Sequence, residues 1–192
     1  MWHRNIFVCE RHLKGKGYLI LIGTHNEKHV PIVIVNVYSP CDSKSKWNLC
    51  EELVNIRKNE RCKTWCMMGD FNAVKKADER KGLNIRRTNK RENIGFNNFI
   101  EKTEMIELPY VGRKYTWYRP NGNAKSRIDR IFVSCEWLDH WPGYRQYILD
   151  RQISDHCAII IKNTQVDWGP KPFRCLHVWH TDIRFRDIVK QK

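Results

Sequence analysis

The sequence has no hydrophobic run long enough to cross a membrane, and this absence limits the possible functions first. The apolar runs YLILIG and PIVIVNVY fall far short of the roughly 20 residues that a membrane-spanning helix needs. The N-terminal stretch MWHRNIFVCERHLKGKG has no apolar core and no cleavage signature of a secretion signal. We therefore expect no membrane partner and no secretion.

The sequence also lacks the cysteine spacings of a zinc site. It has 8 cysteines, but it contains no CxxC pair and no histidine pair at zinc-finger spacing. Cys62 and Cys66 lie four residues apart, and no second Cys or His pair completes a ligand set. We expect reduced, mostly buried thiols of a nuclear or cytoplasmic protein, with no disulfide-linked partner.

Acidic residues are too few to balance the basic ones. The 192 residues include 35 Lys and Arg but 21 Asp and Glu, so the formal net charge is +14. Such an excess favours a polyanionic partner, with nucleic acid first and an anionic membrane surface second. A basic surface without a specific partner is the alternative.

What the sequence does contain is an alternation of short β-rich runs and amphipathic stretches. Residues 18–22, 32–38, 64–68, 144–149 and 157–161 read as strands, and two more strands flank the turn PNGN. Helices are expected after Ser43 or Ser45 as N-cap, over residues 93–105 and over residues 136–141. Residues 75–91 read as a charged loop. This alternation predicts a layered α/β domain.

Chemically capable side chains stand at the ends of several of these strands. Asp70 and Asn72 follow the apolar run TWCMMG, and Tyr38 ends the run VIVNVY. Residues two apart on an extended segment face the same side, so a carboxylate and an amide could together orient a water and hold a phosphate oxygen. The alternatives are an ordinary Asx turn for the first pair and core packing for the tyrosine.

Two further strand ends carry acids and a histidine. Asp129 lies in SRIDRIFV, and Asp155 and His156 lie in QISDHCAIII. A buried Asp129 could fix the tautomer of the His156 imidazole. The alternatives are a surface Asp–His pair and an ion pair of Asp129 with Arg127 or Arg130.

The order of these motifs, NVYSP, GDFNAV, SRIDRIFVS and SDHCAII, resembles the endonuclease/exonuclease/phosphatase superfamily. Within it, VGRKYTWYRPNGNAKSRIDRIFVS and DWGPKPFRCLHVW are most similar to the apurinic-like endonuclease domain of plant LINE-type (non-LTR) retrotransposons. The resemblance implies a four-layer α/β sandwich in which helices flank two packed β-sheets. It also implies cleavage of DNA phosphodiesters with Mg²⁺ or Mn²⁺, and hence a nuclear location.

The resemblance also implies a role for each site residue. Asp70 would orient or deprotonate the attacking water, and Asn72 would bind the scissile phosphate and align that water. His156, oriented by Asp129, would stabilise the charge developing on the phosphate, to which Tyr38 would donate. Asp155 would lie at the metal. Thr116 and Ser154 would help to place the phosphate. Apart from the resemblance, the charged loop 75–91 with Lys75, Lys76, Arg86 and Arg87 could hold backbone phosphates beside the site, and a solvated charged loop is the alternative.

The sequence departs from the family pattern at its start. Family members begin with a WNxRG-like motif and a QET-like motif that carries the main metal ligand, and neither is present here. We therefore expect an N-terminally incomplete domain over residues 1–165, without the first strands of the fold, and an exit segment over residues 166–192 that leads towards an absent reverse transcriptase. Whether it is an enzyme stays open.

The expected function is a retrotransposon-derived, Mg²⁺-dependent endonuclease that is weakened or inactive. The alternatives are a nuclease completed by another chain or an upstream exon, a phosphatase of the same fold, and a non-catalytic nucleic-acid-binding remnant. The oligomeric state does not follow from the sequence.

Overall fold

The computed structural model describes residues 3, 5–82 and 90–163. The strands are β1 (Phe7–Gly15), β2 (Tyr18–His25), β3 (Val30–Tyr38), β4 (Trp65–Asp70), β5 (Arg80–Gly82), β6 (Ile106–Glu107), β7 (Tyr110–Gly112), β8 (Trp117–Tyr118), β9 (Ala124–Ser126), β10 (Asp129–Val133), β11 (Tyr144–Ile148) and β12 (Ile159–Asn163). The helices are α1 (Ser43–Asn59), the 3₁₀ turn η1 (Ala77–Glu79), α2 (Lys90–Thr103) and α3 (Cys135–His140).

A six-stranded sheet in the order β1-β2-β3-β4-β10-β6 forms the centre of the fold. β3 and β4 are parallel because α1 crosses over between them, whereas β1–β2, β2–β3 and β4–β10 pair antiparallel. Two three-stranded sheets, β12-β11-β7 and β5-β9-β8, complete the described strands.

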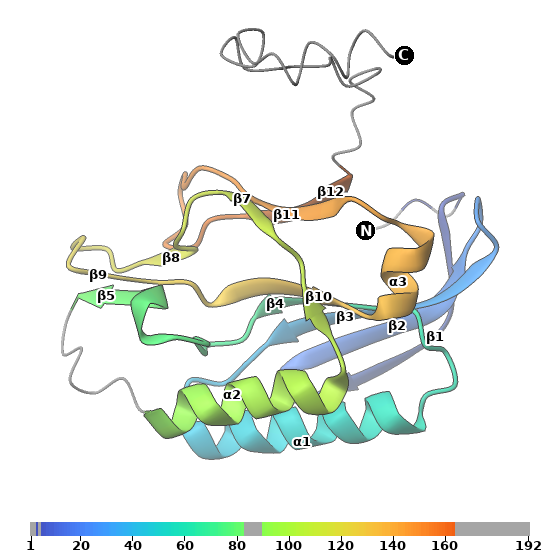
Figure 1. Cartoon of the computed structure of the whole chain (residues 1–192), viewed down its shortest axis with the longest axis horizontal. Coiled ribbons are helices and arrows are strands. Elements are labelled where there is room, and N and C mark those ends of the chain that lie inside the picture. The colour runs from blue at the N-terminus through green and yellow to red at the C-terminus, as the bar shows by residue number, and fades with distance from the viewer. Residues whose placement is uncertain (1–2, 4, 83–89, 164–192) are drawn as a thin grey trace, which may run out of the picture.

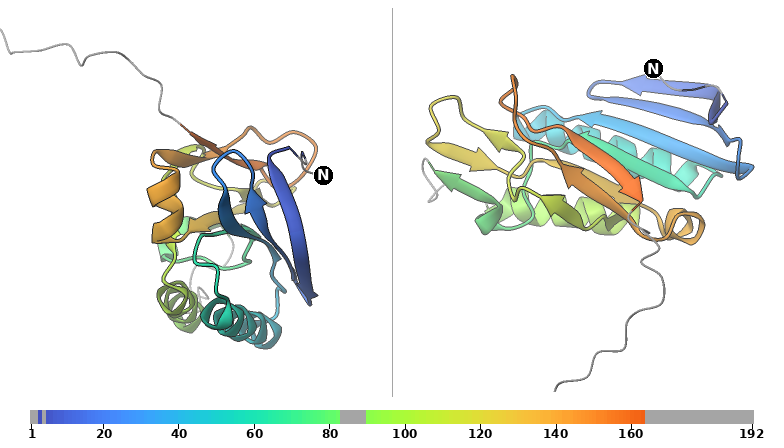
Figure 2. Two further views of the ribbon diagram at one scale, coloured as in Figure 1. Left: turned by 90° about the vertical axis from the view of Figure 1, so that its right-hand side faces the viewer. Right: turned by 90° about the horizontal axis from the view of Figure 1, so that it is seen from above.

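The elements stack in layers (Figures 1 and 2). α1 and α2 cover one face of the six-stranded sheet, and the sheet β12-β11-β7 lies on the other side. The predicted α/β architecture with packed sheets is therefore confirmed. In the part of the chain that the structure describes, both long helices lie on one side, so three of the four expected layers are described.

Two apolar clusters hold these layers together. Between the large sheet and the helices, Phe71 packs edge-on against Phe132 and close to Phe96 and Phe99 of α2. Between the two packed sheets, buried residues from the large sheet meet Trp137 and Trp141 at α3. Each fully buried large apolar side chain contributes roughly 1.5–3 kcal/mol, so both interfaces stabilise the layer order.

The strands expected from periodicity are present, but β1 and the short strands β5, β6 and β7 were not predicted. β1 was not predicted because its exposed, charged middle (CERHLKG) hides the alternation of an edge strand. The N-cap of α1 is also corrected. The Asp42 carboxylate, not Ser43 or Ser45, accepts the Ser45 backbone N–H at 2.8 Å.

No described helix is long and apolar enough to span a membrane.

Residues 75–91 are only in part the charged loop that was expected. They contain η1 and β5 and lead into α2. Arg86 and Arg87 lie outside the described residues, as does the segment 166–192. The expectation of mostly buried thiols is wrong for the seven described cysteines, all free, because only Cys50, Cys66 and Cys157 are buried.

Candidate active site

The site is built on one row of residues across the large sheet. Tyr38 is the register partner of Asp70 in the parallel pair β3–β4, and Asp129 is the partner of Asp70 in the antiparallel pair β4–β10. The ends of β3 and β4 and the start of β10 therefore meet at one edge. Strand ends are where loops can place functional groups.

Two adjoining cavities open at this edge, and both are lined by Tyr38, Asp70 and His156. One has a volume of about 420 Å³ and is also lined by Cys41, Asn72, Arg80, Lys81, Trp117, Ala124, Ser126 and Ile128. The other has a volume of about 400 Å³ and is also lined by Gly69, Asp129, Ser154, Cys157, Ala158 and Ile159. We call these two the catalytic cavity.

The Asp70–Asn72 pair is held in a tight turn. Gly69 has φ +134, and a Cβ there would lie 2.0 Å from the Val37 carbonyl oxygen, so this position requires glycine. Asn72 is left-handed, with φ 48. Its backbone N–H donates to Oδ1 of Asp70 at 2.8 Å. The turn is thus an Asx turn, and it also lies in the cavity.

The amide of Asn72 has a defined orientation. Its Nδ2 donates to the Ser39 carbonyl oxygen at 2.6 Å and to Oδ2 of Asp70 at 3.1 Å. Both amide hydrogens are therefore used within the turn, and the side-chain oxygen Oδ1 is the atom left for a ligand. In this orientation Asn72 presents an acceptor, which suits a water or a cation better than a phosphate oxygen.

Asp70 has an acidity suited to proton transfer. Burial, with a smaller contribution from the neighbouring Asp129 carboxylate, raises the pKa of Asp70 to about 6 against the lowering effects of the Asn72 N–H, His156 and Lys46. A buried acid beside a second acid in a cavity is the usual physical sign of a functional group.

His156 and Asp129 form a second pair. The imidazole Nδ1 lies 3.1 and 3.0 Å from the two carboxylate oxygens of Asp129, as expected from the sequence. Burial raises the pKa of Asp129, and its bonds with Thr116 and His156 oppose that rise. Nδ1 is thus occupied, and Nε2 is the nitrogen available to the cavity.

Three other predicted residues have different surroundings. The Thr116 hydroxyl is fully buried and accepts the backbone N–H groups of Ile128 and Asp129 at 3.1 and 3.0 Å, so it supports Asp129 and does not line the cavity. Asp155 accepts the Trp117 indole N–H at 2.9 Å and does not line the cavity either. Ser154 does line it, and its Oγ accepts the His156 N–H at 3.0 Å.

The basic residues that line the cavity differ from the predicted ones. Lys75 pairs with Glu107 at 2.9 Å, and neither it nor Lys76 lines the cavity. Arg80 and Lys81 from β5 line it instead. They belong to the same charged stretch of sequence, but periodicity does not show that a short strand, β5, brings them to the wall of the cavity.

A buried ion-pair network lies behind the site. Arg130 has no exposed surface and pairs with Glu79 at 2.5 Å and Glu107 at 2.6 Å. Arg127 pairs with Glu107 at 2.7 Å. The two arginines are thus used by these glutamates, and the proposed ion pair of either with Asp129 is not formed among the described residues.

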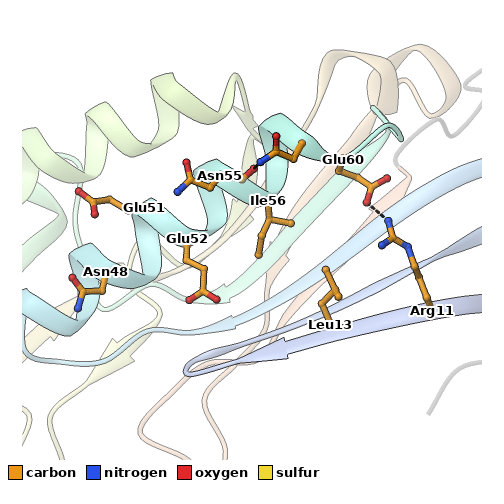
Figure 3. A pocket seen from close by; sticks show the side chains of 9 residues that line it. Arg11, Leu13, Asn48, Glu51, Glu52, Asn55, Ile56 and Glu60 are labelled. Carbon is orange, nitrogen blue, oxygen red and sulfur yellow. Dashed lines mark hydrogen bonds and ion pairs between the residues drawn. The ribbon is translucent and has the colours of Figure 1, made fainter.

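A second hollow lies far from these strand ends, between α1 and β1 (Figure 3). This α1–β1 groove has a volume of about 570 Å³ and is lined by Arg11, Leu13, Asn48, Glu51, Glu52, Asn55, Ile56, Asn59 and Glu60. Arg11 pairs with Glu60, and the Tyr18 hydroxyl donates to Glu52 at 2.6 Å. The groove is lined by polar side chains together with Leu13 and Ile56.

Comparisons with known proteins bear on the family and on the fold. The model of the Endonuclease/Exonuclease/phosphatase family matches residues 3–156. No curated protein matches the chain.

Solved structures share the fold at low identity. The endonuclease domain of TRAS1, a telomere-specific non-LTR retrotransposon, is 16% identical with a TM-score of 0.57, over 78% of this chain and 64% of that one. The AP endonuclease LMAP from Leishmania major is 17% identical with a TM-score of 0.58, over 74% and 53%. The mannosyl-6-phosphatase Bt3783 from Bacteroides thetaiotaomicron is 16% identical with a TM-score of 0.51, over 84% and 68%. The chain thus spans between about half and two thirds of the length of the two nucleases.

Proposed function

The chain belongs to the Endonuclease/Exonuclease/phosphatase family, and from that premise we propose that it is a metal-dependent phosphodiesterase that cleaves DNA, of the kind found in plant LINE-type retrotransposons. The observation that carries the proposal is the row of neighbouring residues Tyr38, Asp70 and Asp129 on three strands. His156 contacts Asp129, and Arg80 and Lys81 line the same cavity. Residues 1–165 would form the nuclease domain, and the site of action would be the nucleus.

In this proposal Asp70 accepts the proton of the attacking water. With a pKa of about 6 it is ionised at neutral pH, yet close enough to neutrality to act as a general base. Asn72 Oδ1 would accept a hydrogen bond from the same water and so align it. Tyr38, whose side chain is exposed at the cavity mouth, would donate its phenol O–H to a phosphate oxygen.

His156 would serve the phosphate. Because Asp129 occupies Nδ1, a protonated His156 would donate from Nε2 to an equatorial oxygen as charge develops there. Thr116 would act through Asp129, since its buried hydroxyl meets the backbone of that strand. Ser154 would hold the backbone of His156 in place.

A divalent cation fits the donor chemistry of the cavity. The carboxylate of Asp70 and Oδ1 of Asn72 are hard oxygen donors, and Mg²⁺ retains several waters, so few protein ligands suffice. The described residues contain no group of three or more acidic, His or Cys side chains around a common point, so we propose that they hold Mg²⁺ or Mn²⁺ weakly. When bound, the cation would polarise the phosphate.

DNA is the proposed substrate because of charge. Arg80 and Lys81 line the cavity together with Trp117. The Lys125 ammonium lies 4.9 Å from the centre of the Tyr115 ring, which places another cation on the neighbouring strands. Cations of this kind hold the backbone phosphates of a nucleic acid.

The test is a nicking assay on supercoiled plasmid. The purified chain is incubated with Mg²⁺, with Mn²⁺ and with EDTA, beside an Asp70→Ala, His156→Ala double variant whose folding is confirmed by circular dichroism. We expect slow, metal-dependent nicking that the double variant loses. Absence of metal-dependent nicking by the folded chain would overturn the proposal and leave a phosphatase activity or a DNA-binding role as the alternatives.

A further inference from the structure

Lys46 is a buried cation at the edge of the catalytic cavity. It is 3% exposed, and it is the fourth residue of α1, which begins at Ser43. Burial disfavours an ammonium ion, and so does the positive end of the helix dipole in the first turn. Because both burial and the helix dipole destabilise the Lys46 ammonium, it requires a contact that compensates for them.

That contact is the turn that carries Asp70 and Asn72. The Lys46 Nζ donates to the backbone carbonyl oxygen of Asn72 at 2.7 Å. The carbonyl belongs to a residue with φ 48, a conformation that most side chains disfavour. The bond therefore acts on the peptide group that follows the left-handed residue, and it fixes the direction in which the turn leaves the strand.

The same turn also forms hydrogen bonds with Ser39. Nδ2 of Asn72 donates to the Ser39 carbonyl oxygen, and the Ser39 N–H donates to the Asp70 carbonyl oxygen at 2.8 Å. Ser39 directly follows β3 and Lys46 lies in the first turn of α1, so the segment from the end of β3 to the start of α1 contacts the turn at two points. Without Lys46, the helix side of this arrangement is lost.

We propose that Lys46 is a positioning residue, whose buried ammonium holds the Asn72 peptide group and thereby keeps the Asp70 and Asn72 side chains aimed into the catalytic cavity. It does not touch the substrate, because its side chain is buried. The kinetic consequence rests on the proposed function, whereas the structural consequence does not.

The test compares three variants. Lys46→Met removes the charge at similar length, Lys46→Arg retains it, and Lys44→Met is the matched control because Lys44 is exposed in the same helical turn. For nicking, we expect Lys46→Met to lower kcat by about 10- to 100-fold with KM changed less than about 2-fold, since a small misplacement of reacting groups affects mainly the chemical step. We expect Lys46→Arg to recover most of the rate and Lys44→Met to match the wild type.

A second readout does not need activity. The ¹H–¹⁵N signals of the Asn72 side-chain amide should shift or broaden in Lys46→Met and return towards their wild-type positions in Lys46→Arg. Should Lys46→Met not fold, the neutral Lys46→Gln takes its place with the same expectations.

The outcomes separate the two proposals. Unchanged Asn72 signals in the folded neutral variant would overturn the role of Lys46, whether or not the chain cuts DNA. An inactive wild-type chain whose Asn72 signals respond to Lys46→Met would overturn the proposed function alone. Equal effects of Lys44→Met and Lys46→Met would also overturn the positioning role.

Discussion

The catalytic cavity and the α1–β1 groove are both polar hollows, and they differ in what their acids contact. The groove is the larger, at about 570 Å³ against about 420 and 400 Å³ for the two parts of the cavity. Its Glu51 and Glu52 are exposed on a helix surface. In the cavity, Asp70 and Asp129 are 7% and 8% exposed and stand side by side on adjacent strands.

This difference shows why volume alone does not identify a site. Water solvates Glu51 and Glu52 of the groove, so their charges have a small effect on one another. The third acid, Glu60, has a side chain that is 9% exposed, and it is paired with Arg11. In the cavity, burial raises the pKa of both acids, and hydrogen bonds fix their orientation. The free energy that this burial costs is offset by the surrounding fold, as is common where groups are arranged for chemistry.

The largest expected effect on the nicking rate comes from a comparison of one acid in the catalytic cavity with one acid in the α1–β1 groove. Asp70→Asn should lower the nicking rate by about 10²- to 10⁴-fold, because it removes the general base. Glu52→Gln retains an acceptor for the Tyr18 hydroxyl and should leave the rate within about twofold. Initial rates on supercoiled plasmid, at equal concentrations of folded protein, measure both. A greater loss for Glu52→Gln than for Asp70→Asn would move the site to the groove.

Asp129→Asn tests the second pair of the cavity. The amide can no longer hold Nδ1 of His156 as a carboxylate does, so we expect nicking to fall by about 10- to 100-fold, as for other orienting partners of a histidine. Asp139→Asn, in the exposed part of α3, is the control. If both variants keep wild-type rates, the orientation of His156 does not matter for catalysis.

The dependence of stability on pH tests whether Asp70 is desolvated in the folded chain. Its pKa rises from 3.8 to about 6 on folding, so the folded state binds the proton more tightly than the unfolded state. The associated stability is present below the unfolded pKa and is lost as the pH rises through the folded pKa.

Asp70→Asn does not titrate, and its free energy of unfolding should therefore gain on that of the wild type by up to about 2 kcal/mol between about pH 4 and pH 7. Urea denaturation in EDTA measures the gap at each pH. A gap that does not change with pH would mean that Asp70 is as well solvated as an acid of the groove.

The sequence predicts the row of strand ends but not everything that surrounds it. Asp70, Asn72, Asp129 and His156 could be found because each directly adjoins an apolar run. The runs beside Asp70, Asn72 and Asp129 form the neighbouring strands β4 and β10, whereas the run after His156 forms β12 of a second sheet. The pairing of His156 with Asp129 was predicted from chemistry, since a buried carboxylate can fix the tautomer of an imidazole.

The parts that could not be predicted depend on contacts between distant segments. Lys46 reads as an ordinary polar position of an amphipathic helix, and only the tertiary fold brings it to Asn72, 26 residues away. Thr116 lies near the motif in sequence, but its burial beneath Asp129 depends on strand register. In the basic stretch, composition alone could not separate Arg80 and Lys81 from Lys75 and Lys76.

The smallest expected effect concerns Arg80 and Lys81 and the salt dependence of DNA binding. Arg80→Ala with Lys81→Ala should weaken DNA binding several-fold and reduce the slope of log K against log salt by about 2, because each cation that contacts a phosphate contributes about one unit. Lys58→Ala with Lys102→Ala removes equal charge from the helix layer, on the side of the sheet away from the small sheets, and should leave the slope unchanged. Fluorescence anisotropy with a labelled duplex in EDTA measures binding without cleavage. Equal slopes for the two double variants would mean that the net charge of the chain attracts DNA and that Arg80 and Lys81 make no specific phosphate contacts beside Asp70.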